Sequence, residues 1–84
     1  MYSLQIEEDV IKAFRKLGKK DPNQMDATNS KIEQILKDPL QFKPLRHPLE
    51  GARRVHVGSF VLIYDVTGST VRLLKYEHHD DAYK

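Results

Sequence analysis

The spacing of hydrophobic residues predicts a strand followed by two helices in the first half of the chain. From Tyr2 to Ile6 apolar and polar residues alternate, which is typical of a short half-buried strand. From Glu7 to Leu17 apolar residues recur three or four positions apart, with acids in the first turn and Gly18 as a C-cap. A second helix is predicted to begin after Asp21, within a sequence that resembles a capping box, and to end at Asp38.

A loop and three strands are predicted for the second half. Residues 40–51 contain two prolines and a glycine, which indicates a loop. Three β-rich runs follow at 52–57, 60–66 and 70–77, and the turns between them have hairpin length. The order β-α-α-β-β-β predicts one α+β domain over residues 1–84. In this domain two helices pack on a mainly antiparallel four-stranded sheet, and the first strand lies at an edge.

The length and composition of the chain exclude several classes of function. The chain has 84 residues, enough for one small domain but not for a fold that encloses a large cofactor. It has no cysteine, which excludes disulfide frameworks, thiolate zinc sites and thiol nucleophiles. No apolar run approaches the length of a membrane span, and the first four residues lead into acidic sequence instead of a signal peptide. We therefore expect a cytoplasmic protein with no membrane contact and no cofactor.

The small net charge conceals an uneven distribution. The sequence has 14 Lys and Arg against 12 Asp and Glu, a formal charge of +2. Between residues 43 and 64, however, Glu50 is the only acid opposed to four cations, which are Lys43, Arg46, Arg53 and Arg54. A basic middle of this kind fits a polyanionic partner and fits a solvated charged face equally well.

Four histidines are the main candidates for chemistry. His47 lies in the predicted loop, His56 in the second predicted strand, and His78 and His79 follow the last strand. They are open to three interpretations: surface residues without a shared role, ligands of a metal ion, or acid–base catalysts. A metal is disfavoured because no two ligands stand at a familiar spacing, and adjacent residues of an extended segment point to opposite sides.

Acid–base catalysis by histidine would suit RNA cleavage without a metal. That reaction needs a base for the ribose 2′-OH proton, an acid for the leaving 5′-oxygen and cations beside the phosphate. The histidines are interleaved with cations that supply the last requirement, namely Arg46, Arg53, Arg54 and Lys75. Spacing by itself does not choose among the three interpretations.

Several short motifs together resemble the RelE/ParE toxin superfamily. The segment His47-Pro48-Leu49-Glu50-Gly51 is followed by a strand that ends in His56-Val57, then by Phe60-Val61-Leu62-Ile63-Tyr64 and finally by His79 with Tyr83. Within the superfamily this pattern is similar to the histidine-rich YafQ-like branch. The likeness in sequence covers residues 43–83, and the predicted β-α-α-β-β-β order extends it over the whole chain.

The resemblance implies an activity and assigns residues to it. The family activity is ribosome-dependent cleavage of messenger RNA in the A site, held in check by a bound antitoxin. His47 matches the loop histidine and His56 the strand histidine, both implicated in proton transfer. His79 matches the C-terminal catalytic histidine, because its spacing to Tyr83 fits the motif and that of His78 does not. Tyr83 would stack on a base or contact the phosphate.

The same resemblance places residues beside the RNA. Lys75 falls where the family has a cation that neutralises the scissile phosphate. Phe60 falls where an aromatic ring supports the site, and core packing is an equally good interpretation of it. The remaining expected RNA contacts are the basic residues of the middle segment, Lys43, Arg46, Arg53 and Arg54.

Two positions depart from the pattern and keep a second hypothesis open. Val61 stands where many members carry a catalytic arginine, and Ser59 stands where the YafQ-like branch has an aspartate. The alternative is a ParE-like or catalytically degenerate protein, which would inhibit a protein target such as gyrase or only bind an antitoxin. An antitoxin partner is expected under either hypothesis.

Overall fold

The computed structural model describes residues 2–45 and 51–82, without the side chains of the last two. It confirms the predicted element order. The elements are β1 (Ser3–Ile6), α1 (Glu8–Lys20), α2 (Pro22–Lys37), β2 (Ala52–Val57), β3 (Phe60–Thr67), β4 (Thr70–His78) and α3 (His79–Ala82). The short helix α3 was not predicted. Arg46, His47 and Tyr83 lie outside the described residues.

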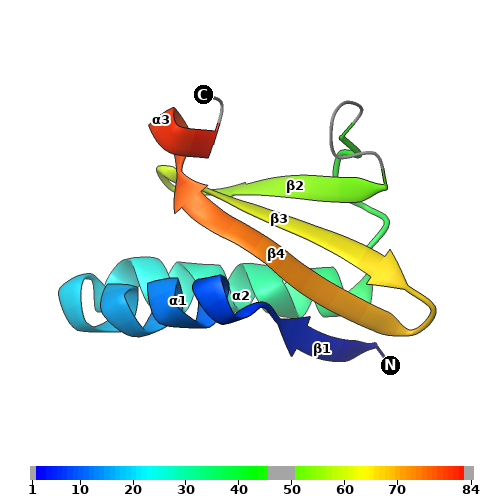
Figure 1. Cartoon of the computed structure of the whole chain (residues 1–84), viewed down its shortest axis with the longest axis horizontal. Coiled ribbons are helices and arrows are strands. Elements are labelled where there is room, and N and C mark those ends of the chain that lie inside the picture. The colour runs from blue at the N-terminus through cyan, green and yellow to red at the C-terminus, as the bar shows by residue number, and fades with distance from the viewer. Residues whose placement is uncertain (1, 46–50, 83–84) are drawn as a thin grey trace.

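The strands form one mixed sheet in the order β1-β4-β3-β2. β1 runs parallel to β4 at the edge, and the other two pairings are antiparallel, as the hairpin-length turns predicted. Both hairpins turn at a glycine with φ of +59°, Gly58 and Gly68, which suits the first central position of a type II′ turn. Figure 1 shows α1 and α2 together beneath one face of this sheet.

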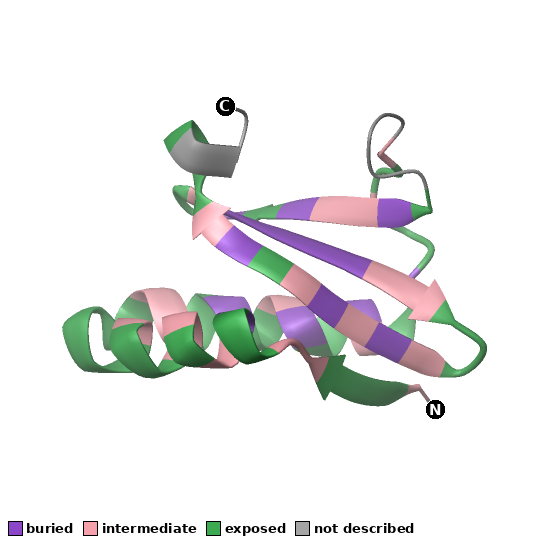
Figure 2. Ribbon diagram, in the orientation of Figure 1, coloured by how far each residue is buried: buried purple, intermediate pink, exposed green. Residues whose placement is uncertain are grey.

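The main core lies between the helices and the sheet (Figure 2). Val10 of α1 and Ile35 of α2 pack there against Leu62 and Tyr64 of β3 and Leu73 of β4, all of them buried. The intervening residues of β3, Val61 and Ile63, are buried on the opposite face in a smaller cluster with Ala52. This confirms β3 as a central strand that is apolar on both faces.

Asp21 joins the two helices and corrects two details of the prediction. α1 does not end at Gly18; it continues to Lys20, and the Asp21 N–H donates to the Leu17 carbonyl at 2.7 Å. The Asp21 carboxylate then caps α2 by accepting from the Gln24 N–H at 3.1 Å. Because the Asp21 N–H is already paired, the reciprocal half of a capping box is not formed. The Gln24 side chain reaches the sheet instead.

The segment after α2 is held against β2 and β3. Leu45 N–H donates to the Ala52 carbonyl at 2.9 Å, and the Arg54 N–H donates to the Lys43 carbonyl at 3.1 Å. Tyr64, fully buried in the core, donates its hydroxyl proton to the Pro39 carbonyl. None of the helices in the described part of the chain is both long and apolar enough to span a membrane.

Candidate functional site

The sheet face turned away from α1 and α2 carries several of the predicted site residues. Directly paired residues of antiparallel strands lie on the same face. His56 of β2 pairs with Val61, and Arg54 of β2 pairs with Ile63, so both project on the side of the smaller cluster. Lys75 of β4 pairs with Ile63 from the other side. Three of the predicted site residues therefore share one face across β2, β3 and β4.

His79 joins this group at the end of the sheet. Its imidazole lies beside that of His56, with 5.6 Å between ring centroids and 36° between ring planes. Its backbone N–H donates to the Ser59 carbonyl at 2.7 Å, which ties the start of α3 to the β2–β3 turn. Both imidazoles are exposed, and the Asp80 carboxylate lies 3.8 Å from His79 Nδ1. We call His56 and His79 the histidine pair.

The pair can exchange protons with a ligand bound at the sheet face. Two exposed imidazoles from different elements can act on opposite sides of one reacting group, one as proton acceptor and the other as donor. Arg54 and Lys75 both pair with Ile63 and supply positive charge on the same face, two residues along each strand from the level of His56. Glu77 pairs with Val61 at the level of His56 and adds a carboxylate to this face. Within the described residues, no group of three or more His, Cys, Asp or Glu side chains is arranged to hold a metal ion.

Two predicted site residues lie on the helix side of the sheet instead. Arg53 follows the alternation to the side of Val55, and its guanidinium donates to the carbonyls of Phe42 at 2.8 Å and Leu40 at 3.3 Å. Arg53 thus anchors the preceding loop. Phe60 stacks on Tyr76, with 4.9 Å between centroids and 5° between planes. The structure does not bring either side chain to the histidine pair.

The remaining predicted residues divide in the same way. His78 packs edge-on against Phe60, with 5.5 Å between ring centroids, so adjacent His78 and His79 contact rings on opposite sides of the sheet. This agrees with the expectation that only one of them joins a shared site. Lys43 is exposed in the segment before β2. Arg72, which was not a predicted site residue, is paired with Asp65 by hydrogen bonds of 2.9 and 2.6 Å, and this pairing raises the pKa of Arg72.

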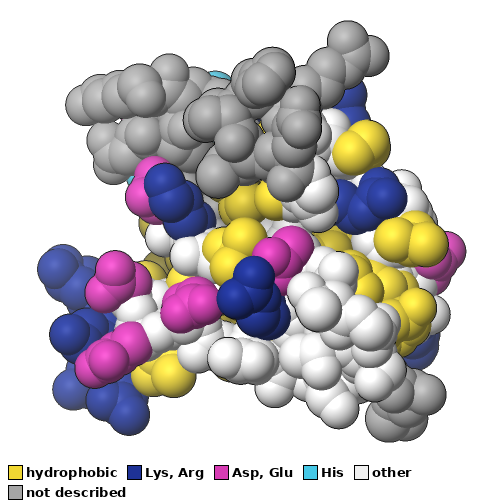
Figure 3. All heavy atoms as spheres, turned by 45° about the vertical axis from the view of Figure 1, so that its right-hand side comes forward, with side chains coloured by type: hydrophobic (Ala, Val, Ile, Leu, Met, Phe, Trp, Pro, Cys, Tyr) yellow, Lys and Arg dark blue, Asp and Glu magenta, His cyan; other side chains and the backbone are white. Residues whose placement is uncertain are grey.

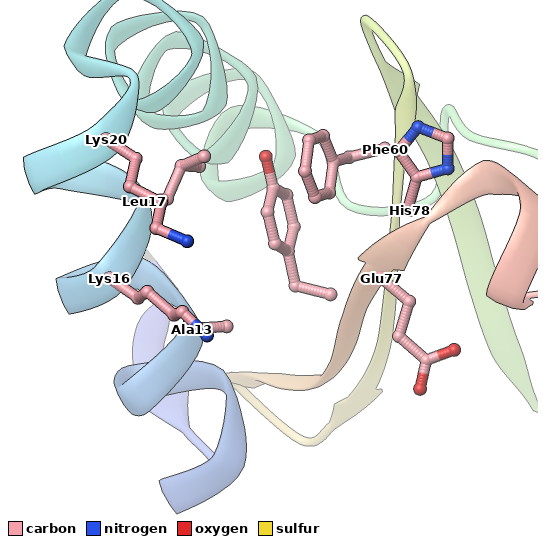
Figure 4. Close-up of a pocket in the computed structure, with 8 residues that line it drawn as sticks. Ala13, Lys16, Leu17, Lys20, Phe60, Glu77 and His78 are labelled. Carbon is pink, nitrogen blue, oxygen red and sulfur yellow. The ribbon is translucent and has the colours of Figure 1, made fainter.

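Sequence reasoning missed an apolar groove of about 590 Å³ on the helix side. Figure 4 shows its two walls. α1 contributes one stripe of side chains, which are Ala13, Lys16, Leu17 and Lys20, and the sheet contributes Phe60, Tyr76, Glu77 and His78. The α1 residues stand at positions i, i+3, i+4 and i+7, and this spacing of one helix face is the signal in the sequence that could have revealed the stripe.

Comparisons with known proteins agree with this fold. A family model described as the ParE toxin of type II toxin-antitoxin systems matches residues 1–83. A putative toxin, RelE4 of Methanocaldococcus jannaschii, is 39% identical and is aligned over 100% of this chain and 93% of its own length.

Solved structures show the same architecture. The toxin–antitoxin complex RelBE2 from Mycobacterium tuberculosis contains a chain that is 25% identical, with a TM-score of 0.77 and coverage of 92% of this chain and 96% of that one. YafQ from Escherichia coli BL21(DE3) is 19% identical, with a TM-score of 0.78 and full coverage of both chains. These matches confirm the resemblance that the motifs indicated: the chain belongs to the ParE toxin family of type II toxin–antitoxin systems, within the RelE/ParE superfamily.

Proposed function

We propose that this toxin is a ribosome-dependent endoribonuclease that cleaves messenger RNA without a catalytic metal ion. The observation that carries the proposal is the histidine pair, two exposed imidazoles 5.6 Å apart on the sheet face that also carries Arg54 and Lys75. In the proposed reaction one imidazole contacts the 2′-oxygen and the other the 5′-oxygen of the same phosphodiester, so both rings have to lie on one face.

The proposed reaction is an internal transesterification. One histidine removes the proton of the ribose 2′-OH, and the 2′-oxygen attacks the adjacent phosphorus. The bond to the 5′-oxygen breaks, and the second histidine protonates that leaving oxygen. The products are a 2′,3′-cyclic phosphate and a 5′-hydroxyl. His56, or His47 from the loop, is the proposed base and His79 the proposed acid, although the proton balance is the same with these roles exchanged.

The cations on the same face stabilise the transition state. The pentacoordinate phosphorus carries more negative charge than the starting diester, and donors fixed in place beforehand stabilise that extra charge without reorganising. Arg54 and Lys75, which flank Ile63 on the face of the histidine pair, are the proposed donors. The proposal gives Arg53 and Phe60 no direct part in the chemistry, because their contacts lie on the other side of the sheet.

A reconstituted translation reaction tests this function. Purified toxin is added to ribosomes that are translating a defined message, and primer extension maps new 5′ ends. Discrete ends that require both toxin and ribosomes are expected. A message that stays full-length at toxin concentrations equal to the ribosomes would contradict the proposal. The substrate and ribosome place the proposed activity in the cytoplasm.

A second function is favoured by two observations. The matching family model is that of the ParE toxin, and Val61 occupies the position where many superfamily members carry a catalytic arginine. Under this alternative the toxin blocks a protein target such as gyrase. Intact messages together with inhibited DNA supercoiling by purified gyrase would select it over the nuclease.

We also propose that the partner antitoxin covers the groove of α1 with an acidic amphipathic segment. The floor of the groove is apolar, formed by Ala13, Leu17 and the rings of Phe60 and Tyr76, while Lys16 and Lys20 lie at its rim. Figure 3 shows basic side chains gathered at the end of the molecule where α1 ends. A segment with an apolar stripe flanked by Asp or Glu complements such a surface.

Calorimetric titration with the protein encoded beside this toxin gene tests the partner surface. Reversing the rim charges with Lys16→Glu and Lys20→Glu is expected to weaken binding at least 10-fold. Lys37→Glu, at the exposed end of α2, serves as the matched control and is expected to bind like the wild type. If the protein with Lys16→Glu and Lys20→Glu binds the antitoxin as tightly as the Lys37→Glu control does, the antitoxin does not bind in this groove.

A further inference from the structure

The side chain of Gln24 connects α2 to two strands of the sheet. Its Nε2 donates one hydrogen bond to the Val57 carbonyl at 2.7 Å and another to the Tyr76 hydroxyl at 3.1 Å. Val57 ends β2 and Tyr76 lies on β4, so the two acceptors belong to strands on either side of β3. A primary amide has two N–H groups, and both are used in this bridge.

The two bridged strands are the ones that lead to the histidine pair. Val57 directly follows His56 in β2, and β4 passes from Tyr76 through His78 into His79 at the start of α3. Between them, the Ser59 carbonyl in the β2–β3 turn accepts the His79 N–H at 2.7 Å. One amide group thus ties together the strand ends from which both imidazoles project.

The surroundings of Gln24 hold the bridge in place. Thr28, fully buried one turn further along α2, shares a hydrogen bond of 2.7 Å with the Tyr76 hydroxyl and donates to the Gln24 carbonyl at 2.9 Å. Gly58 leaves room for the amide, because a Cβ at that position would lie 2.7 Å from Gln24 Oε1. The Tyr76 ring is fixed by stacking on Phe60. Neither Gln24 nor Tyr76 is therefore free to rotate away.

We infer that Gln24 is a positioning residue, which fixes how the ends of β2 and β4, each paired with β3, are oriented relative to one another and thereby holds His56 and His79 at their working distance. The inference rests on the proposed function for its catalytic consequence only. Without the amide, the Val57 carbonyl and the Tyr76 hydroxyl lose their common donor, so the two strand ends keep their ladders with β3 but lose the bridge that joins them through α2. A displacement of about 1 Å at reacting groups lowers a rate by about 100-fold.

The Gln24→Met variant tests the inference, since methionine keeps the length of the side chain and removes both donors. Nuclear Overhauser contacts between the ring protons of His56 and His79 report the geometry of the pair without any RNA. These contacts are expected to weaken in Gln24→Met and to persist in Gln34→Met, a control at an exposed position of the same helix. In the translation reaction, kcat is expected to fall 10-fold to 100-fold, with KM for the programmed ribosome unchanged.

Two further variants separate positioning from a loss of stability. Tyr76→Phe removes only the β4 half of the bridge and keeps the ring, so weakened ring contacts are expected there as well. Ile35→Val loosens the buried core beneath α2. It is expected to leave the ring contacts intact even if its Tm falls as far as that of Gln24→Met. Wild-type ring contacts in both Gln24→Met and Tyr76→Phe would overturn the inference. If the wild type cleaves no message, the nuclease proposal fails, and the ring contacts still decide whether Gln24 positions the pair.

Discussion

His56 and His79 lie far apart in the sequence, yet their imidazole rings are 5.6 Å apart in the fold. The β2–β3 hairpin makes this possible, because its turn brings the Ser59 carbonyl to the His79 backbone N–H. The ring contact joins His56 of β2 to His79, the first residue of α3. It leaves His78, the immediate neighbour of His79, packed against Phe60 on the other side of the sheet.

Arg53 and Arg54 are adjacent and are expected to differ in function. Arg54→Ala should lower the cleavage rate about 100-fold, because Arg54 is on the face of the histidine pair, where the proposed mechanism uses its charge beside the phosphate. Arg53→Ala should leave the rate nearly unchanged and lower the free energy of unfolding by about 1 kcal/mol, since it removes hydrogen bonds to the loop carbonyls. Urea denaturation and cleavage rates of the two variants check this contrast, and a larger loss of rate in Arg53→Ala would refute it.

Tyr64 makes stability depend on pH in the alkaline range. Burial raises the pKa of its hydroxyl from 10.0 to about 12. Below pH 10 the hydroxyl is protonated in both states, so it adds no slope. Between pH 10 and 12 the unfolded chain releases this proton and the folded chain retains it, so the free energy of unfolding falls by about 1.4 kcal/mol per pH unit.

The slope is measured by urea denaturation at several pH values in this range, for the wild type and for Tyr64→Phe. The difference between the two proteins isolates Tyr64 from other groups that titrate there. Tyr64→Phe also loses the hydrogen bond to the Pro39 carbonyl. That loss lowers the free energy of unfolding by the same amount at every pH, so it does not contribute to the difference in slope. Parallel curves for the two proteins would contradict the assignment.

Asp21 stabilises the α1–α2 junction through its carboxylate. Asp21→Ala is expected to lower the free energy of unfolding by about 1 kcal/mol, because the Gln24 N–H loses its cap. For a domain of this size such a loss lowers Tm by about 4–8 °C. Asp21→Asn keeps an acceptor oxygen and should retain most of the stability. Circular dichroism during heating compares the variants, and an Asn variant as unstable as the Ala variant would argue against capping.

The four strands, α1 and α2 were predicted well because each has a local signal in the sequence. The predicted end of α1 at Gly18 was wrong for a local reason. Lys19 and Lys20 are good helix formers, and the Asp21 N–H pairs with the Leu17 carbonyl, so the helix continues through Gly18. The alternation of Val55 and Val57 with Arg54 and His56 shows which side chains of β2 lie on the helix side and which lie on the opposite face. That alternation is sufficient to assign Arg53 to the helix side, since residues two apart in a strand share a face.

Contacts between residues far apart in the chain could not be predicted from the sequence. The meeting of His56 with His79 depends on the hairpin register and on α3, a four-residue helix without a periodic signal. The bridge from Gln24 depends on how α2 crosses the sheet, and its capping-box position in the sequence suggested a different partner. The groove arises only where the stripe of α1 faces the rings of Phe60 and Tyr76.

The proposed mechanism depends most directly on His79, and its neighbour provides a matched control. The measurement is the rate of message cleavage in the reconstituted translation reaction, with ends mapped by primer extension, for wild type, His79→Ala and His78→Ala. The account predicts a loss of about 100-fold or more for His79→Ala and a rate near that of the wild type for His78→Ala. Undiminished cleavage by a folded His79→Ala variant would contradict it.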